Sequence, residues 1–430
     1  MEQVFARSIV PPVRRTSASS TGTRRRRVLL VTNRYRTYHR RVIETLVDAF
    51  DFGIVWLSPP YAHDPVPPDL GARLQSWTLG EDPRRLTYRD PHRSARLFKL
   101  IATEGRHADL VIAPAPAAWK GKLIYAAARV ARVPVAFRFD VWREGDGLVR
   151  STPSRPPSGP RAMVSQAVDR FVEKHGDALL VPGSASREFI AARGIERDRI
   201  VEFHRLIPEI SRLPLDPELV GRLKAIKGSR VAFLYLGRVM HQKGLVPLIR
   251  AFRALLSANR DAVLFVVGGP IEKDIGAGKP SVEYYEEAKM LAESEPRIVF
   301  AGNVDPTTVH NYYEACDVFV HPHVANVDGQ EVFEPWGNVI SEAACMRLAI
   351  IASDRIPAAF DLVENNVNGF LLDARRIEEQ LVPAMARFVD HPDVLDGFAA
   401  ASRRKYDAFA DPAALVAGLN QIIDRARGTS

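Results

Sequence analysis

Two glutamates, Glu334 and Glu342, lie within the stretch FEPWGNVISEAACMRL at residues 333–348. A Pro-Trp-Gly turn follows Glu334, and the apolar, Ala-rich run after it predicts a helix that begins near Gly337. The first N–H groups of a helix lack intrahelical acceptors and attract anions. Glu342 lies about 12 Å beyond Glu334 at a helical rise. Carboxylates accept strong hydrogen bonds from hydroxyls. This layout suits a sugar nucleotide, which has hydroxyls at both ends and a diphosphate between them.

The position of Glu334 in the chain favours a binding site over the ordinary alternative of two solvated charges. An apolar strand is expected at residues 318–320, and a loop at 321–332 connects it to Glu334. Glu334 therefore lies beyond the carboxyl end of a strand. In open α/β sheets, ligands bind at that edge.

A second group of polar residues occurs in LYLGRVMHQKG, where a predicted strand ends at Gly237 and a helix follows Gly244. A glycine at a strand end lets a phosphate approach the backbone. Arg238 and Lys243 lie on the connecting loop, where two cations can bracket a diphosphate. Surface cations are the alternative interpretation. Neither a GxxxxGK[ST] nor a GxGxxG spacing is present. Two further glycine turns, VVGGP and FAGNV, follow later strands.

Short apolar runs alternate with helical periodicity along most of the chain, which predicts parallel, doubly wound α/β sheets. The runs lie at residues 28–32, 53–57, 109–113, 134–139, 178–182, 199–204, 230–236, 262–267, 297–301, 317–320, 348–353 and 370–372. A proline-containing stretch at 206–217 reads as an interdomain linker. We therefore expect two Rossmann-like domains that face a cleft.

The expected domain boundaries follow from these patterns. Residues 1–26 form a basic, disordered tail, residues 27–207 an amino-terminal domain, and residues 208–400 a carboxy-terminal domain. Residues 401–430 form a carboxy-terminal helix that is expected to pack back toward the first domain.

Composition restricts the class of protein. The chain has 430 residues, a formal charge of +8 and a pI of about 9.5, a balance that favours phosphate-bearing partners. No nucleic-acid fold signature is present, so nucleic acid is not an expected partner. No apolar run reaches membrane-spanning length, and no secretory signal appears. Cys316 and Cys345 lie in apolar patterns and are expected to be buried thiols of a cytoplasmic protein.

The ordered series of motifs in the second half resembles a known family. Strand–GR–x4–KG–helix, VVGG, FAGNV, YYEACDVFVHP, E-x7-E, IIASD and NGFLLD resembles the nucleotide-binding domain of retaining glycosyltransferases of the GT-B fold. The GT4 family, glycosyl transferase group 1, is the most similar. The resemblance covers residues 231–373, and in the first half it extends only to the strand–helix alternation and to LLVPGSASREFIAARGI.

The resemblance implies roles for particular residues. Arg238 and Lys243 would bind the donor diphosphate and stabilise it as it leaves, and Glu334 would bind hydroxyls of the donor sugar, so these three are the expected catalytic residues. The remaining positions expected to contact the donor are Gly237, Asn303, Val304, Gly337, Asn338, Val339 and Glu342, with Glu342 at the ribose and Asn303 and Val304 near the base. The family works without a bound metal, so a nucleoside diphosphate sugar is expected as co-substrate and no metal or other cofactor.

The sequence departs from the family in its first domain. The glycine pair usual after the first strand is replaced by TNRYRTYHRR, and the histidine usual after the fourth strand is absent from FRFDVWREGD. We therefore take Arg34, His39, Arg138 and Asp140 as acceptor-side candidates. The basic loop at 32–41 favours an anionic acceptor, such as a lipid-linked phosphate or an acidic glycan, although a solvated helix start is the alternative. Pro335 also replaces the glycine usual after the first glutamate.

These observations predict a hexosyltransferase that moves a sugar to an acceptor hydroxyl in glycan biosynthesis. The alternatives are a GT-B relative with other chemistry, such as a sugar-nucleotide epimerase or phosphorylase, and a catalytically inactive binding protein. Arginines at 24–27 and 34–41 further suggest peripheral contact with an anionic membrane on its inner face.

Overall fold

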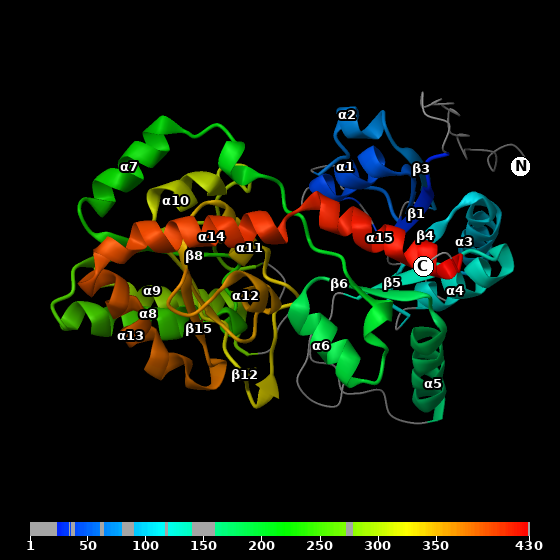
Figure 1. The fold of residues 1–430 in the computed structure, drawn as a ribbon. Coiled ribbons are helices and arrows are strands. Elements are labelled where there is room, and N and C mark those ends of the chain that lie inside the picture. The colour runs from blue at the N-terminus through cyan, green and yellow to red at the C-terminus, as the bar shows by residue number, and fades with distance from the viewer. Residues whose placement is uncertain are drawn as a thin grey trace, which may run out of the picture.

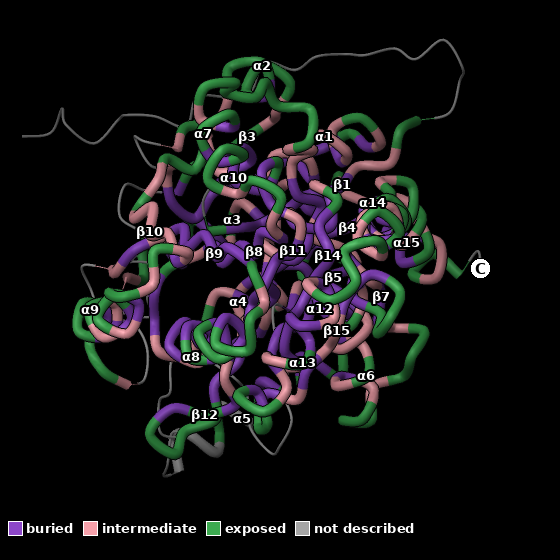
Figure 2. The backbone as a smooth tube through the Cα atoms, turned by 90° about the vertical axis from the view of Figure 1, so that its left-hand side faces the viewer, coloured by how far each residue is buried: buried purple, intermediate pink, exposed green. Residues whose placement is uncertain are grey.

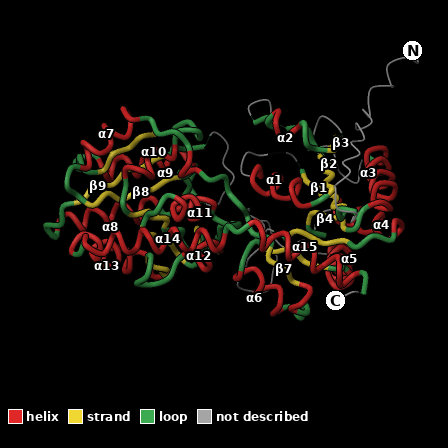
Figure 3. Tube along the Cα trace, turned by 45° about the horizontal axis from the view of Figure 1, so that its top comes forward, coloured by secondary structure: helices red, strands yellow, loops and turns green. Residues whose placement is uncertain are grey.

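The computed structural model describes residues 24–33, 35, 39–60, 64–79, 90–116, 119–139, 160–271 and 278–428. Within these ranges the chain forms two α/β domains that lie side by side (Figure 1). Each domain is built on a parallel sheet with helices on both faces (Figure 3). The prediction of two Rossmann-like domains is confirmed.

The first domain contains a seven-stranded parallel sheet in the order β3-β2-β1-β4-β5-β6-β7. Its strands are β1 (Arg27–Thr32), β2 (Asp51–Trp56), β3 (Gln75–Thr78), β4 (Leu110–Pro114), β5 (Val135–Arg138), β6 (Ala178–Val181) and β7 (Ile200–Glu202). Six of them coincide with predicted apolar runs. The edge strand β3 was not predicted, because Trp77 is the only buried residue of its four and leaves no apolar run to recognise.

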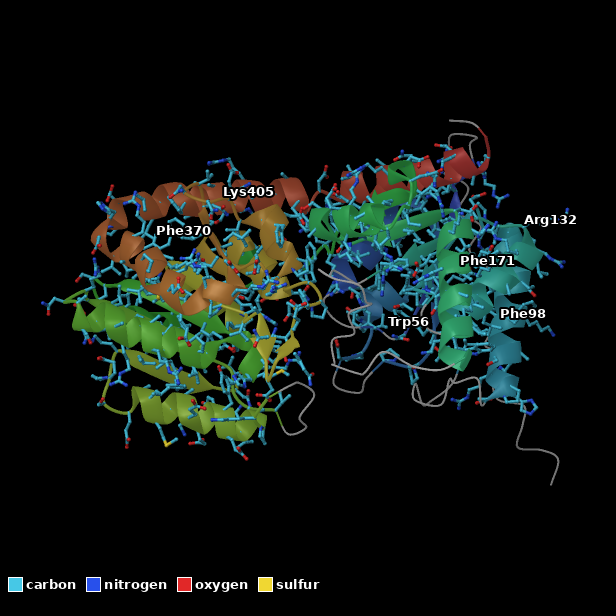
Figure 4. All side chains as sticks on the ribbon, turned by 90° about the horizontal axis from the view of Figure 1, so that it is seen from below. Trp56, Phe98, Arg132, Phe171, Phe370 and Lys405 are labelled. Atoms are coloured by element: carbon cyan, nitrogen blue, oxygen red, sulfur yellow. The ribbon has the colours of Figure 1, made fainter. Side chains whose placement is uncertain are left out.

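Alternate residues of the first sheet face different helices, as the pleat requires. Val28 and Leu30 pack with α1, whereas Leu29 and Val31 pack in a second cluster with α3 and α4. The helices are α1 (Arg40–Ala49), α2 (Pro68–Gly71), α3 (Pro91–Glu104), α4 (Trp119–Ala131), α5 (Pro160–His175) and α6 (Ser184–Ala192). Trp56, at the end of β2, belongs to the interior of this domain (Figure 4).

The second domain contains a six-stranded parallel sheet in the order β10-β9-β8-β11-β14-β15. The strands are β8 (Val231–Leu236), β9 (Ala262–Val267), β10 (Ile298–Gly302), β11 (Val318–His321), β14 (Ala349–Ser353) and β15 (Gly369–Leu372), and all coincide with predicted runs. A short hairpin of β12 (Asn326–Val327) and β13 (Gln330–Glu331) lies in the loop before Glu334. The strands run through the buried interior (Figure 2).

The helices of the second domain cover both faces of its sheet. They are α7 (Pro217–Lys227), α8 (Leu245–Ser257), α9 (Ser281–Ala292), α10 (Val309–Ala315), α11 (Asn338–Cys345), α12 (Pro357–Leu362) and α13 (Ile377–Asp390). Helices α8, α9 and α13 pack on one face, and α10, α11 and α12 on the other. No helix of the described residues is both long and apolar enough to span a membrane.

The carboxy-terminal residues connect the two domains. The predicted carboxy-terminal helix at 401–430 is divided, because α14 (Leu395–Phe409) and α15 (Pro412–Ala426) are separated by Ala410 and Asp411. Helix α14 packs on α11 of the second domain, whereas α15 lies along α1 and β7 of the first (Figure 1). Arg26 forms an ion pair with Asp424 at 2.5 Å and joins β1 to α15.

The interdomain linker carries a half-buried network centred on Glu209. Its carboxylate accepts hydrogen bonds from Arg403 at 2.7 Å, Ser211 at 2.7 Å and the Cys345 thiol at 3.1 Å, and Arg41 lies 3.7 Å away. Burial opposes ionisation of Glu209, but these hydrogen bonds outweigh it and lower its pKa to about 2. The carboxylate thereby joins α1, the linker, α11 and α14.

We expect Glu209→Gln to lower the Tm at neutral pH, because the neutral amide loses about 2 kcal/mol of charge-assisted hydrogen bonding. The pKa is depressed in the folded state, so this stabilisation is present above the unfolded value near 4.5 and is lost as pH falls toward 2. The Tm difference between wild type and variant should therefore shrink between those pH values in calorimetry. Glu314→Gln, which removes an exposed pair with Lys224, is the matched control. A difference that stays constant with pH would contradict this interpretation.

Candidate functional site

The carboxyl ends of β8 and β9 approach each other through glycine backbone. Gly268 has a φ of +122°, and a Cβ atom there would lie 1.9 Å from the carbonyl oxygen of Gly237. Gly237 has a φ of +151°. Strand β8 pairs with β9 on one side and with β11 on the other, so this edge is the topological switch point of the sheet.

The loop after β8 turns Lys243 inward and Arg238 outward. A short 3-10 helix, His241–Lys243, ends at Gly244, where φ is +72° and a Cβ atom would lie 2.0 Å from the Pro322 carbonyl oxygen. The Lys243 side chain is 8% exposed. Arg238 is exposed and forms no hydrogen bond or ion pair with another described residue. The two predicted cations thus share one loop but differ in burial.

Lys243 and Glu334 form an ion pair at the switch point. The Glu334 side chain is 17% exposed. Burial opposes its ionisation, but attraction by Lys243 prevails and lowers its pKa to about 2. The structure therefore brings together two of the three predicted catalytic residues, and it places a charged carboxylate beside a charged amine.

Two histidines that were not predicted as site residues lie beside this pair. His321 and His323 are buried, and burial and the nearby Lys243 lower the pKa of both rings, that of His323 to about 4. His321 stacks on Tyr235, and a Cβ atom on Gly237 would lie 4.0 Å from its ring. Their signal in the sequence was the HPH motif at the end of an apolar strand.

The E-x7-E stretch adopts the predicted turn and helix. Gly337 has a φ of +98° and precedes α11, and a Cβ atom there would lie 2.4 Å from Ile356 and 3.7 Å from the Glu334 side chain. Asn338 and Val339, both half-buried, supply the first N–H groups of the helix. Glu334 therefore lies just before the start of the helix, four residues from Asn338.

Glu342 occupies the middle of α11 and has a neutral partner. Tyr313 donates a hydrogen bond to its carboxylate at 3.0 Å. Burial raises the pKa of Glu342, and the hydrogen bond from Tyr313 offsets part of that effect. The two glutamates of the motif therefore differ in charge environment, since one is paired with a cation and the other with a phenol.

Asn303 and Val304 follow β10, two strands away from β8. Asn303 is exposed, and a Cβ atom on Gly269 would lie 3.0 Å from its side chain. Val304 is half-buried against the apolar core. Strands are spaced about 5 Å apart, so these residues lie about 10 Å from the Gly237 backbone.

The acceptor-side candidates are only partly described. Arg34 and Asp140 lie outside the described residues. His39 caps the start of α1 and is half-buried, and Arg138 is half-buried at the carboxyl end of β5. Sequence reasoning missed Lys120, a half-buried residue of α4 whose Nζ atom lies 3.2 Å from Asn33 Oδ1 at the end of β1. Burial lowers the pKa of Lys120.

Two arginines that were expected near the acceptor are paired elsewhere. Arg40 forms ion pairs with Glu44 at 2.7 Å and Asp69 at 2.9 Å. Arg41 hydrogen-bonds to Tyr406 at 2.8 Å and belongs to the interdomain contact. Glu44 lies one turn along the same helix, whereas Asp69 and Tyr406 lie on other helices and were not indicated by the sequence.

The first domain meets the second at the turn that carries Glu334. A Cβ atom on Gly183, after β6, would lie 2.8 Å from the Trp336 ring and 2.2 Å from the Asp361 carboxylate. The Ser184 N–H lies 3.2 Å from the same carboxylate. The carboxyl edge of the first sheet therefore faces the Glu334 turn.

A cavity of 470 Å³ lies beyond the loop of Lys243, between α8, α9 and the start of α13. Its cations are already paired, Lys279 and Arg250 with Glu287, and Arg376 with Glu379. The cavity therefore lacks the free positive charge expected of a diphosphate site.

Comparison with known proteins agrees with this geometry. Residues 222–405 match the family model Glycosyl transferases group 1. The chain is similar to the GDP-mannose-dependent alpha-mannosyltransferase of Corynebacterium glutamicum, with 31% identity over 163 residues, which is 38% of this chain and 32% of that protein. The matched region spans about a third of the length of such curated relatives.

Two solved structures superimpose over nearly the whole chain. A glycosyltransferase from Rickettsia africae has a TM-score of 0.68 at 16% identity and covers 94% of this chain and 100% of its own. Anabaena HepE in complex with UDP has a TM-score of 0.64 at 15% identity and covers 93% of this chain and 100% of its own. The chain therefore has the two-domain GT-B fold, and residues 222–405 form a glycosyl transferases group 1 domain.

Proposed function

We propose that this chain is a retaining glycosyltransferase of the GT4 family that moves a hexose from a nucleoside diphosphate sugar to an acceptor hydroxyl. The observation that carries this proposal is the pairing of Lys243 with Glu334 beside the mouth of α11. This pairing sets a cation beside a carboxylate that can accept hydrogen bonds from hydroxyls, four residues before the first residue of α11. The similarity to HepE, whose structure contains UDP, supports a nucleotide as the ligand.

The proposed mechanism assigns each group a physical task. Lys243, Arg238 and the first N–H groups of α11 neutralise the diphosphate as it leaves. Glu334 accepts hydrogen bonds from hydroxyls of the donor sugar, and the unshared oxygen of Glu342 accepts from the ribose. Gly237 lets a phosphate approach the backbone, while Asn303 and Val304 border the base. Positioning and leaving-group stabilisation supply most of the rate.

The acceptor is proposed to be a glycan or lipid-linked molecule with an anionic group. Because Gly183 contacts Trp336, the edge that carries Arg138 and Lys120 faces the donor. Arg138 ends the strand next to β6, about 5 Å away, and Lys120 follows the next strand. Among the described residues Lys120 has no carboxylate partner, so an anionic group of the acceptor could form an ion pair with its ammonium group. Contact with an anionic membrane in the cytoplasm is proposed on the same grounds of charge.

Arg238→Ala and Lys243→Met should each lower nucleotide release about 100-fold or more, because each removes positive charge that stabilises the leaving group. The donor is first chosen by thermal shift with UDP, GDP, ADP, TDP and their sugars, and release is then followed in a coupled assay. Arg253→Ala removes an exposed cation from α8 and serves as the control. Near-normal rates in both site variants would exclude the assigned phosphate contacts. Release at an equal rate without any acceptor other than water would favour the alternative with other chemistry, and no nucleotide release at all would favour the inactive binding protein.

We expect transfer to persist in excess EDTA, because side chains and helix N–H groups supply the charge that a metal ion supplies in other transferases. The measurement is nucleotide release with and without chelator. Loss of activity that returns when Mg²⁺ or Mn²⁺ is added would contradict the proposal of a metal-independent site.

Lys120→Met should weaken binding of an anionic acceptor analogue about tenfold, because it removes the half-buried cation. With the donor site saturated by the chosen nucleoside diphosphate, calorimetry compares glucose 6-phosphate with glucose. Lys99→Met, which removes an exposed cation from α3, is the matched control. Equal binding of glucose and its phosphate to the wild type would exclude an anionic acceptor at Lys120.

A further inference from the structure

The two side chains that the proposed function directs at different parts of the donor bind each other. Lys243 is intended for the diphosphate and Glu334 for the sugar, yet they form an ion pair whose side chains are only 8% and 17% exposed. They come from loops 91 residues apart in the sequence. In this pair, Lys243 occupies the place beside Glu334 where a sugar hydroxyl would bind. Glu334 likewise occupies the place beside Lys243 where a phosphate would bind.

No second cation among the described residues pairs with the carboxylate of Glu334. His321 and His323 pack nearby, but burial keeps both rings neutral at physiological pH. Arg355, whose carbonyl oxygen accepts from the Glu334 N–H, has its guanidinium near Glu331 and Asp354, at 4.0 and 3.9 Å. Lys243 alone neutralises Glu334, so its removal leaves a buried carboxylate without a cation.

An uncompensated buried carboxylate is costly. A free nucleoside diphosphate offers phosphate oxygens to Lys243 and nothing to Glu334, so it must compete with the carboxylate. A sugar nucleotide offers phosphates to Lys243 and hydroxyls to Glu334. The affinities of the two ligands therefore differ by more than the contacts of the sugar itself. Only the sugar nucleotide gives new partners to both Lys243 and Glu334 when their ion pair opens.

We propose that Glu334 is a specificity-determining residue that discriminates the sugar nucleotide from the free nucleoside diphosphate by holding Lys243. When hydroxyls of the donor sugar bind the Glu334 carboxylate in place of Lys243, Lys243 is released to bind the diphosphate. After transfer the remaining nucleoside diphosphate has lost those hydroxyls, so Glu334 recaptures Lys243 and product release is favoured. This inference rests on the proposed function.

The test measures binding of the chosen nucleoside diphosphate and of its sugar by calorimetry. Glu334→Gln should bind the free nucleoside diphosphate about tenfold more tightly than the wild type, because Lys243 is no longer held. The same variant should bind the sugar nucleotide less tightly. Glu342→Gln, the same chemical change at the other end of the motif, should not tighten binding of the nucleoside diphosphate, because Glu342 holds no cation that the change could release. It should weaken that binding, because it alters the carboxylate that is proposed to accept from the ribose.

A double-mutant cycle separates competition from simple charge repulsion. In a Lys243→Met background, Glu334→Gln should leave the affinity for the nucleoside diphosphate unchanged, whereas removal of a repelling charge would still raise it. Glu331→Gln, an exposed carboxylate in the preceding loop, measures the general effect of charge. If Glu334→Gln does not fold, Glu334→Asp carries the same test with a shorter reach to Lys243.

The outcomes distinguish the inference from the proposed function. A wild type that binds none of the four nucleoside diphosphates or their sugars overturns the proposed function. A wild type that binds, together with a folded Glu334 variant that binds the nucleoside diphosphate no more tightly, overturns the inference alone. Tightening that persists in the Lys243→Met background also overturns it.

Discussion

A carboxylate that leaves water requires a cation or several hydrogen bonds, and this constraint shapes the centre of the molecule. Glu334 lies beside two buried, neutral histidines, and Lys243 supplies the positive charge that compensates its carboxylate. Meeting this requirement brings the loop after β8 to the turn before α11. The cation is thereby fixed at the switch point of the sheet, beside the turn that precedes α11.

Close backbone approach makes this arrangement compatible with a packed interior. Gly268 lies against the Gly237 carbonyl and Gly244 against the Pro322 carbonyl, at distances where any Cβ atom would clash. The first contact joins the ends of β9 and β8, and the second joins the start of α8 to the end of β11. Because interiors are densely packed and yield little to added atoms, larger residues there would displace the loop that carries Lys243.

The donor side and the interdomain contact share one segment. Trp336 follows Glu334 by two residues, is fully buried, and stacks on Phe409 between α14 and α15. Gly183 of the first domain packs on the same ring. The Glu209 network ties the linker to α11 at Cys345. The position of the first domain and the geometry of the Glu334 turn therefore depend on the same contacts.

The sequence by itself determined the alternation of strands and helices, the two sheets, and the start of α11 at the Pro-Trp-Gly turn, because apolar periodicity and turn residues are local signals. Only the tertiary structure decided which charges meet. The pairs Lys243–Glu334 and Arg41–Tyr406 and the burial of Lys120 depend on contacts between distant segments, and the spacing of residues along one segment does not predict them.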